Sequence, residues 1–503
     1  MSRKKKTLLN VVVSLVKLTL YTLLALPVSR EIISYYGSSV NGVIATASQT
    51  TVLLQILEGG FTIATLVALF KPFVQKDFDK FNRLLSVTAA AFKKLAVIAL
   101  TVGLSISIIY PCFINADLAY WKCVLIFFMI TVSTVLNFAF FQPRIIAFFV
   151  AQKEYVVQSN TMAFNTLSQL TMLLLVLLHC DVLWLRFAVM LILAAKGVCI
   201  CFLAKREFPF MRLDVPSEGE KIHGTGDVLI GNIITALYAA GPIFMIAVMF
   251  GTVAASVFSV YNMFFSLISN TMYVIAIAPK SAFGQLMYDG EGAAGRKFKD
   301  LFGAFETVVM GLQTISYATA FVVVLPLLAL YTSKMSDSAC YINPFYALCF
   351  SLLGFSQNIH VPAELLLQVG SRFKAIRNIQ IVVLITMLVC GCVGAKLWGM
   401  QGMLCGIIVA NCVRVSCEVF CAYRNILNKK LTLFLMKLVL MVLFGIGIAA
   451  LEMQIKLPLP TWGSALGFAA GVAALNALAV GVLAYVLIPR GAINVIFHKL
   501  HES

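Results

Sequence analysis

The sequence predicts an all-α protein that crosses a membrane about fourteen times, and three observations support this fold class. Hydrophobic residues make up 61% of the 503 residues and charged residues only 12%, about half the share in a typical soluble protein. The mean hydropathy is +0.96. The apolar residues fall in continuous blocks of about 20, the length of a membrane-spanning helix, rather than in the alternating pattern of a membrane β-barrel.

Polar breaks between the apolar blocks place each predicted helix in order. Lys71-Pro72 closes the second block, for example, and proline disfavours a continued helix at that point. The predicted spans are 8–28, 43–69, 87–114, 123–142, 161–180, 183–204, 228–250, 253–279, 304–331, 342–369, 379–395, 400–422, 432–451 and 463–488.

The positions of Lys and Arg predict how these helices are oriented. With the N-terminus inside, 28 of the 38 basic residues fall in inner segments and four within the spans. Basic residues gather on the cytoplasmic side of membrane proteins, so the sequence predicts a multi-pass protein of a bacterial cytoplasmic (inner or plasma) membrane with both termini cytoplasmic. The net charge of +17 is then an orientation signal rather than a sign of nucleic-acid binding. Six basic residues remain for outer loops: Arg30, Lys122, Arg186, Lys334, Lys396 and Lys456.

The spacing of the helices predicts two halves and an appendage. Residues 1–204 form an N-terminal six-helix bundle, 205–227 a cytoplasmic linker, and 228–422 a C-terminal six-helix bundle; 423–503 add two helices and a short cytoplasmic tail. Gly37 precedes Phe92 by 55 residues, and Gly251 precedes Phe305 by 54. Internal repeats of this kind are common in secondary transporters.

Motifs for catalysis and nucleotide binding are missing. The sequence has no phosphate-binding G-x-x-x-x-G-K-[ST] loop, no H-E-x-x-H zinc motif and no G-x-S-x-G nucleophile motif. We therefore predict a protein that is not an enzyme, with no catalytic residues, no metal and no cofactor. The 13 cysteines lie mostly within apolar blocks, where we expect them to pack as small apolar residues.

Polar residues at membrane depth are costly, and they usually face a cavity or a partner. Four predicted helices carry them on one face, and three cations stand alone. Several of these features also have a purely structural explanation. Polar stripes arise from hydrogen bonds between helices, and His360–Glu364 can be one such bond. Arg414 and Glu418 can neutralise each other, and Lys196 can extend toward the inner surface. The stripes are Thr51, Gln55, Glu58 and Thr62; Asn262, Ser266, Asn270 and Tyr273; Gln357, His360, Glu364 and Gln368; and Asn411, Arg414 and Glu418; the single cations are Lys17, Arg144 and Lys196.

Short motifs in both halves resemble one family of transporters. In the first half these are Arg30, Tyr36-Gly37, Asn41-Gly42-Val43, Leu57-Glu58-Gly59-Gly60-Phe61, Leu69-Phe70-Lys71-Pro72, Asn82 and Phe92-Lys93-Lys94; in the second, Val260-Tyr261-Asn262, Phe283-Gly284, Gly290-Glu291 and Phe305-Glu306. They are similar to the pattern of bacterial lipid-linked oligosaccharide flippases of the polysaccharide transporter family. That family belongs to the superfamily of the multidrug and toxic compound extrusion transporters.

The resemblance implies a fold, a substrate and partners. It implies two six-helix bundles around a central cavity and export of undecaprenyl-pyrophosphate-linked oligosaccharide repeat units by alternating access. The exported repeat units are then used to build capsule, exopolysaccharide or a related surface polysaccharide. The further partners implied are membrane lipid, a polysaccharide polymerase and glycosyltransferases. Arg30, Glu58 and Lys71 match the family pattern by position. A cation-coupled multidrug antiporter of the same superfamily is the alternative, and it predicts an acidic cavity.

A pyrophosphate needs cationic partners in a low-dielectric cavity, and histidine titrates near physiological pH. We therefore predict two groups of functional residues. The substrate-binding group is Lys17, Arg30, Glu58, Arg144, Lys196, Asn262 and Arg414, and the proton-coupling group is His360, Glu364 and Glu418.

Overall fold

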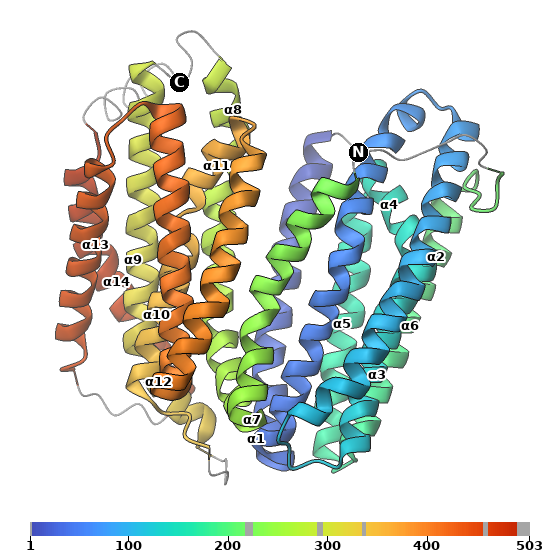
Figure 1. Cartoon of the computed structure of the whole chain (residues 1–503), viewed down its shortest axis with the longest axis horizontal. Helices are drawn as coiled ribbons and strands as arrows, with labels where there is room; N and C mark the ends of the chain where they lie inside the picture. The colour runs from blue at the N-terminus through green and yellow to red at the C-terminus, as the bar shows by residue number, and fades with distance from the viewer. Residues whose placement is uncertain (1–2, 217–224, 289–294, 334–338, 456–460, 490–503) are drawn as a thin grey trace. The chain divides into compact units, whose positions relative to one another are not determined.

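A computed structural model describes residues 3–216, 225–288, 295–333, 339–455 and 461–489. These residues are almost all helical, and none of them is in a β-strand (Figure 1). The helices are α1 (Arg3–Val74), α2 (Phe78–Ile109), α3 (Tyr120–Leu136), α4 (Gln142–Val150), α5 (Glu154–Leu177), α6 (Val182–Glu207), α7 (Thr225–Ile277), α8 (Lys280–Tyr288), α9 (Arg296–Thr332), α10 (Pro344–Asn358), α11 (Val361–Val369), α12 (Phe373–Ala422), α13 (Thr432–Glu452) and α14 (Trp462–Leu487).

Two glycines divide the longest helices at matching places. Gly37 in α1 has φ 86° and ψ 166°, and Gly251 in α7 has φ 85° and ψ 174°. Only glycine adopts this backbone conformation readily, because a Cβ atom would clash there. The two glycines that the sequence comparison pairs therefore make the same break in the backbone, as the predicted repeat requires.

The predicted all-α, multi-span fold class is confirmed. Within the described residues, nine helical segments are long and apolar enough to cross a membrane, and two of these segments each consist of two helices joined at a kink. The segment Ile233–Gly284 is broken at Gly251, and Phe373–Leu427 is broken at Trp398 and Gly399. These nine segments provide eleven crossings when the two kinked ones are counted twice. The two parts of α1 and one span formed by α10 with α11 bring the number to about fourteen.

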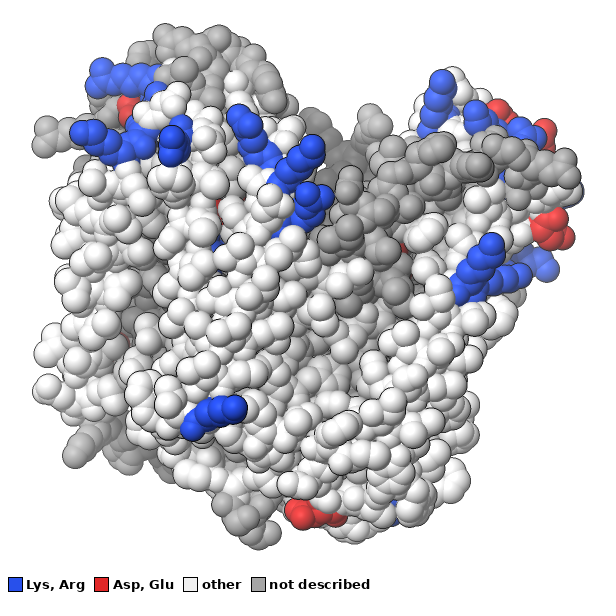
Figure 2. All heavy atoms as spheres, in the orientation of Figure 1, with Lys and Arg blue, Asp and Glu red and all other residues white. Residues whose placement is uncertain are grey.

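The chain divides inside α7, just after Val260, into two compact units. Unit 1 is the part up to Val260 with a short segment near residue 339, and unit 2 is the remainder. On the face drawn in Figure 2, Lys and Arg gather at one end of each unit, and the surface below them is almost uncharged. That distribution suits a protein whose middle lies in lipid. The division into two six-helix bundles and an appendage stays a prediction.

In unit 1, α1 and α7 approach closely through small and polar residues that directly follow their kinks. A Cβ atom on Gly42 would lie 1.7 Å from the backbone oxygen of Thr252, so only glycine fits there. Ser39 Oγ lies 2.8 Å from Thr252 Oγ1, and the Asn41 amide donates to Ser256 Oγ at 2.7 Å. Small residues and interhelical hydrogen bonds are the usual means of packing helices in a membrane.

In unit 2, α13 and α14 pack against α9. Two buried polar groups lie in this packing: Lys437 on α13 donates to Thr307 Oγ1 of α9 at 2.7 Å, and Asn476 on α14 donates to Thr319 Oγ1 of α9 at 3.0 Å. The Asn476 amide also donates to Glu452 of α13 at 3.2 Å. The last two helices are thus attached to unit 2 by hydrogen bonds as well as by apolar packing.

Candidate functional site

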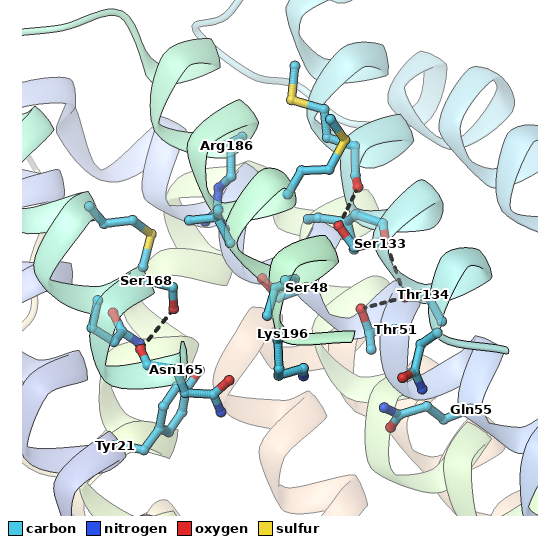
Figure 3. A pocket seen from close by; sticks show the side chains of 18 residues that line it. Tyr21, Ser48, Thr51, Gln55, Ser133, Thr134, Asn165, Ser168, Arg186 and Lys196 are labelled. Atoms are coloured by element: carbon cyan, nitrogen blue, oxygen red, sulfur yellow. Dashed lines mark hydrogen bonds between the residues drawn. The ribbon is translucent and has the colours of Figure 1, made fainter. Parts of the chain in front are cut away.

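Unit 1 contains a cavity of about 440 Å³, lined by α1, α3, α5 and α6 (Figure 3). Helix α6 contributes one continuous face, since Arg186, Met190, Leu193 and Lys196 follow one another at intervals of three or four residues. Arg186 and Lys196 are ten residues apart, which is about 15 Å along a helix. The cavity therefore has a cation at two different depths.

The other helices supply uncharged polar groups. Thr51 and Gln55 come from α1, and Thr134 of α3 donates to Thr51 Oγ1 at 3.3 Å. In Figure 3 the side chain of Lys196 is seen between these residues and the α5 residues Asn165 and Ser168. Among the described residues that line the cavity there is no Asp or Glu. The lining therefore has a formal charge of about +2 and many hydrogen-bonding groups.

Two polar atoms of the lining are buried without a hydrogen bond. They are Arg186 Nε and Gln169 Oε1, and neither has a partner among the described residues. The Arg186 side chain is only 8% exposed. Buried polar atoms are nearly always hydrogen-bonded, and an unpaired one lowers stability. These two atoms can therefore form further hydrogen bonds within the cavity.

Lys17, a predicted binding residue, lies beside this cavity but does not line it. Its Nζ donates to Gln158 Oε1 of α5 at 2.7 Å, and its charge interacts with Glu154 and with Lys196. Lys17 thus places a second positive charge near Lys196, partly offset by the Glu154 carboxylate. Lys196 lines the cavity, and whether it binds substrate stays a prediction.

Glu58 is linked to the cavity through two amides. The Gln142 amide donates to the Glu58 carboxylate and, at 3.4 Å, to Thr62 Oγ1. Asn137, which lines the cavity, donates to Gln142 Oε1 at 3.5 Å. Residues Asn137–Phe141 form a π-helical turn, a feature that often occurs at functional sites. The predicted stripe of α1 therefore faces α3 and α4.

Two predicted cations lie elsewhere in unit 1. Arg144 on α4 lines a second cavity of about 620 Å³, together with Lys205 and Arg212, and is not part of the first. Arg30 is half-buried in the part of α1 before Gly37 and lines neither cavity. Neither residue therefore lines the cavity that contains Lys196. Their role in substrate binding stays a prediction.

In unit 2 the three predicted coupling residues come together. His360, at the break between α10 and α11, has its Nε2 3.5 Å from Glu364 Oε2 and 3.9 Å from Glu418 Oε2. Arg414 interacts electrostatically with His360 and Glu418. One ligand atom from each of the three side chains lies within 4.8 Å of the others, a spacing that suits a shared cation, but the Arg414 charge opposes a metal ion. Asn262 is exposed on α7.

Arg186 is a lining residue that the sequence prediction misses. The count of basic residues places it in an outer loop, but it lies in the second turn of α6, is buried and lines the cavity. Its spacing of ten residues from Lys196 puts the two on one helix face, and the sequence contains that signal. The outer-loop assignment is wrong: Arg186 already falls inside the predicted span 183–204, and α6, which begins at Val182, contains it.

No protein-family model matches the sequence, and a search of curated proteins finds no match. Solved structures do match. The lipid II flippase MurJ, in an inward closed conformation, superposes with a TM-score of 0.69 at 9% identity, covering 95% of this chain and 100% of MurJ. An inward-facing multidrug resistance MATE family transporter of the MOP superfamily gives 0.65 at 13% identity, covering 82% and 98%.

This chain has the fold of MurJ and of the MATE transporters. The Vibrio cholerae MATE transporter VcmN also matches, with a TM-score of 0.52 at 13% identity over 83% of this chain and 99% of VcmN. The resemblance found in the sequence is thus confirmed at the level of the fold. Flippases and drug transporters share this fold, so the substrate has to be argued from the site.

Proposed function

We propose that this chain is a flippase that exports undecaprenyl-pyrophosphate-linked oligosaccharide repeat units across the bacterial cytoplasmic membrane by alternating access. The observation that carries the proposal is the cavity of unit 1, with Arg186 and Lys196 on one face of α6 and no carboxylate among the described lining residues. The MurJ fold supports it, because MurJ is a flippase for lipid II.

The cavity chemistry fits the two polar parts of such a substrate. A pyrophosphate carries about two negative charges, and charge-assisted hydrogen bonds from Arg and Lys to phosphate oxygens are among the strongest in proteins. The amides of Gln55, Asn165 and Gln169 offer donors and acceptors to sugar hydroxyls. Moving the negative charges outward from a negative interior gains about 2.3 kcal/mol per charge per 100 mV, so the membrane potential favours export.

A cation-coupled multidrug antiporter is the alternative, because the MATE structures share the fold. Such a protein needs an acidic cavity for cationic drugs. The cavity of unit 1 is cationic, and the Glu58 carboxylate beside it already accepts a hydrogen bond from the Gln142 amide. The charge of the site therefore favours the flippase.

Deletion of the gene in its native host tests the proposal. We expect loss of one surface polysaccharide and accumulation of its lipid-linked repeat unit, both reversed by a plasmid copy. Staining of the surface glycan and mass spectrometry of extracted lipids measure the two effects. Normal surface glycans together with increased sensitivity to cationic drugs would instead identify an antiporter.

We also propose that His360, Glu364 and Glu418 couple transport to protons. Transport by the wild-type protein is then expected to depend on pH, and Glu364→Gln is expected to flatten the profile, because the amide cannot exchange a proton. The initial rate in vesicles between pH 5.5 and 8.5 measures the effect. Asp79→Asn, the same chemical change on an exposed residue of α2, is the control. An identical profile in wild type and Glu364→Gln rules out this role.

A further inference from the structure

We propose that the second cavity of unit 1 binds the head group of an anionic phospholipid of the surrounding bilayer. The cavity has a volume of about 620 Å³ and is lined by α4, the last turns of α6 and the segment that follows α6. Three of its lining residues are basic, namely Arg144, Lys205 and Arg212, and one is acidic, Asp214. Its net positive charge complements a lipid phosphate.

One acidic group next to the cavity is already neutralised, and the three basic residues outnumber the single lining carboxylate, Asp214. Glu207, in the same turn as Lys205, forms an ion pair with Lys153. The guanidinium of Arg144 donates to the backbone oxygen of Phe140 and interacts electrostatically with Cys201, another lining residue. Lys205 and Arg212 have no ion pair among the described residues.

An apolar helix face leads away from the basic residues. Val198, Cys201, Phe202 and Lys205 lie on one face of α6, at intervals of three or four residues. Val198 is 62% exposed and Phe202 is 70% exposed. Seven residues of helix cover about 10 Å, so an acyl chain can lie along Val198 and Phe202 while its phosphate contacts Lys205. A free phosphate ion would gain nothing from these side chains.

The segment after α6 is fixed in place, so the cavity is preformed. The Asn82 amide donates to the backbone oxygen of Phe210 at 2.8 Å, and Asn82 Oδ1 accepts from the backbone N–H of Arg212 at 3.0 Å. The ring of Phe210 lies 4.0 Å from that of Phe78, and the ring of Phe208 lies 5.1 Å from that of Phe148. Arg212 is therefore held beside α6 without a ligand.

The predicted orientation places this cavity at the cytoplasmic surface, because the segment after α6 belongs to the predicted inner linker. Basic pockets between helices on that side are typical sites for anionic lipid head groups. The inference does not depend on the transported substrate.

Native mass spectrometry of the purified full-length protein tests the inference. Titration with cardiolipin or phosphatidylglycerol is expected to show saturable binding, and phosphatidylethanolamine is expected to bind far more weakly. Lys205→Ala combined with Arg212→Ala is expected to weaken binding of the anionic lipids about 30-fold, or about 2 kcal/mol at about 1 kcal/mol per basic residue. Lys396→Ala, which removes an exposed lysine outside the cavity, is expected to leave binding unchanged.

Two further arms separate the sources of the phosphate. Phe202→Gln is expected to weaken lipid binding, and inorganic phosphate at millimolar concentration is not expected to displace the lipid. Displacement by inorganic phosphate, or tighter binding of undecaprenyl pyrophosphate than of cardiolipin at this cavity, would overturn the proposal. Equal binding of cardiolipin by wild type and the double variant would also overturn it.

Discussion

Replacing both Arg186 and Lys196 by methionine is expected to lower the transport rate of the pyrophosphate-linked lipid at least about 100-fold. Each cation is expected to make charge-assisted hydrogen bonds to the pyrophosphate, worth about 1.5–3 kcal/mol apiece. Each single variant should therefore lose about 10-fold or more. Translocation of a fluorescent undecaprenyl-pyrophosphate sugar in vesicles measures the rate, with Lys396→Met as the control.

The stability of the Arg186 variant separates a binding role from a structural one. Arg186 is a buried cation whose Nε makes no hydrogen bond to a described residue, and burying a charge is costly, so Arg186→Met removes that cost. We expect its thermal unfolding temperature to be unchanged or higher, while transport falls. A large loss of stability with normal transport would show that Arg186 holds the fold rather than the substrate. Functional sites often lower the stability of a protein in this way.

Lys437→Met is expected to destabilise unit 2 by about 3–5 kcal/mol, the usual effect of removing one partner from a buried charged group. Lys437 is 1% exposed, and its Nζ donates to Thr307 Oγ1 and Gly303 O. Its charge also interacts with Glu306, which is 1% exposed. The Glu306 carboxylate accepts a hydrogen bond from Tyr423 at 2.7 Å, while its Oε1 has no partner among the described residues.

Thermal unfolding of the purified protein in detergent measures this effect. Glu306→Gln combined with Lys437→Met removes both charges, and we expect it to restore most of the stability because no buried charge is left uncompensated. Lys430→Met, which removes an exposed lysine near α13, should unfold at the wild-type temperature. A Lys437→Met protein as stable as wild type would show that the group contributes nothing to the packing of α13.

The sequence predicts the elements of this fold well because membrane helices are recognised from length and apolarity alone. Comparing the two halves pairs Gly37 with Gly251 by spacing, and the structure adds that both break the backbone in the same way. The meeting of His360 with Glu364 is also predictable, because residues four apart in a helical segment share a face. Glu418 joins them through tertiary packing of α12.

Other parts of the site depend on information that a hydropathy pattern lacks. The pattern shows that Arg144 is near a membrane helix, but not which side of α4 faces which cavity. Arg186 falls inside the predicted span 183–204, but the hydropathy pattern does not show that its side chain lines a cavity. The contact of Lys437 with α9 joins residues 130 positions apart, and no periodicity in the sequence signals such a pair.

The most direct test measures two activities in the same reconstituted vesicles. We expect the purified protein to translocate a fluorescent undecaprenyl-pyrophosphate oligosaccharide, seen as a change in the fraction open to an external quencher. We expect no accumulation of a cationic dye in response to a pH or sodium gradient. Lipid translocation that is absent in protein-free vesicles and in the Arg186→Met, Lys196→Met protein would support the flippase. Gradient-driven dye transport without lipid translocation would contradict it.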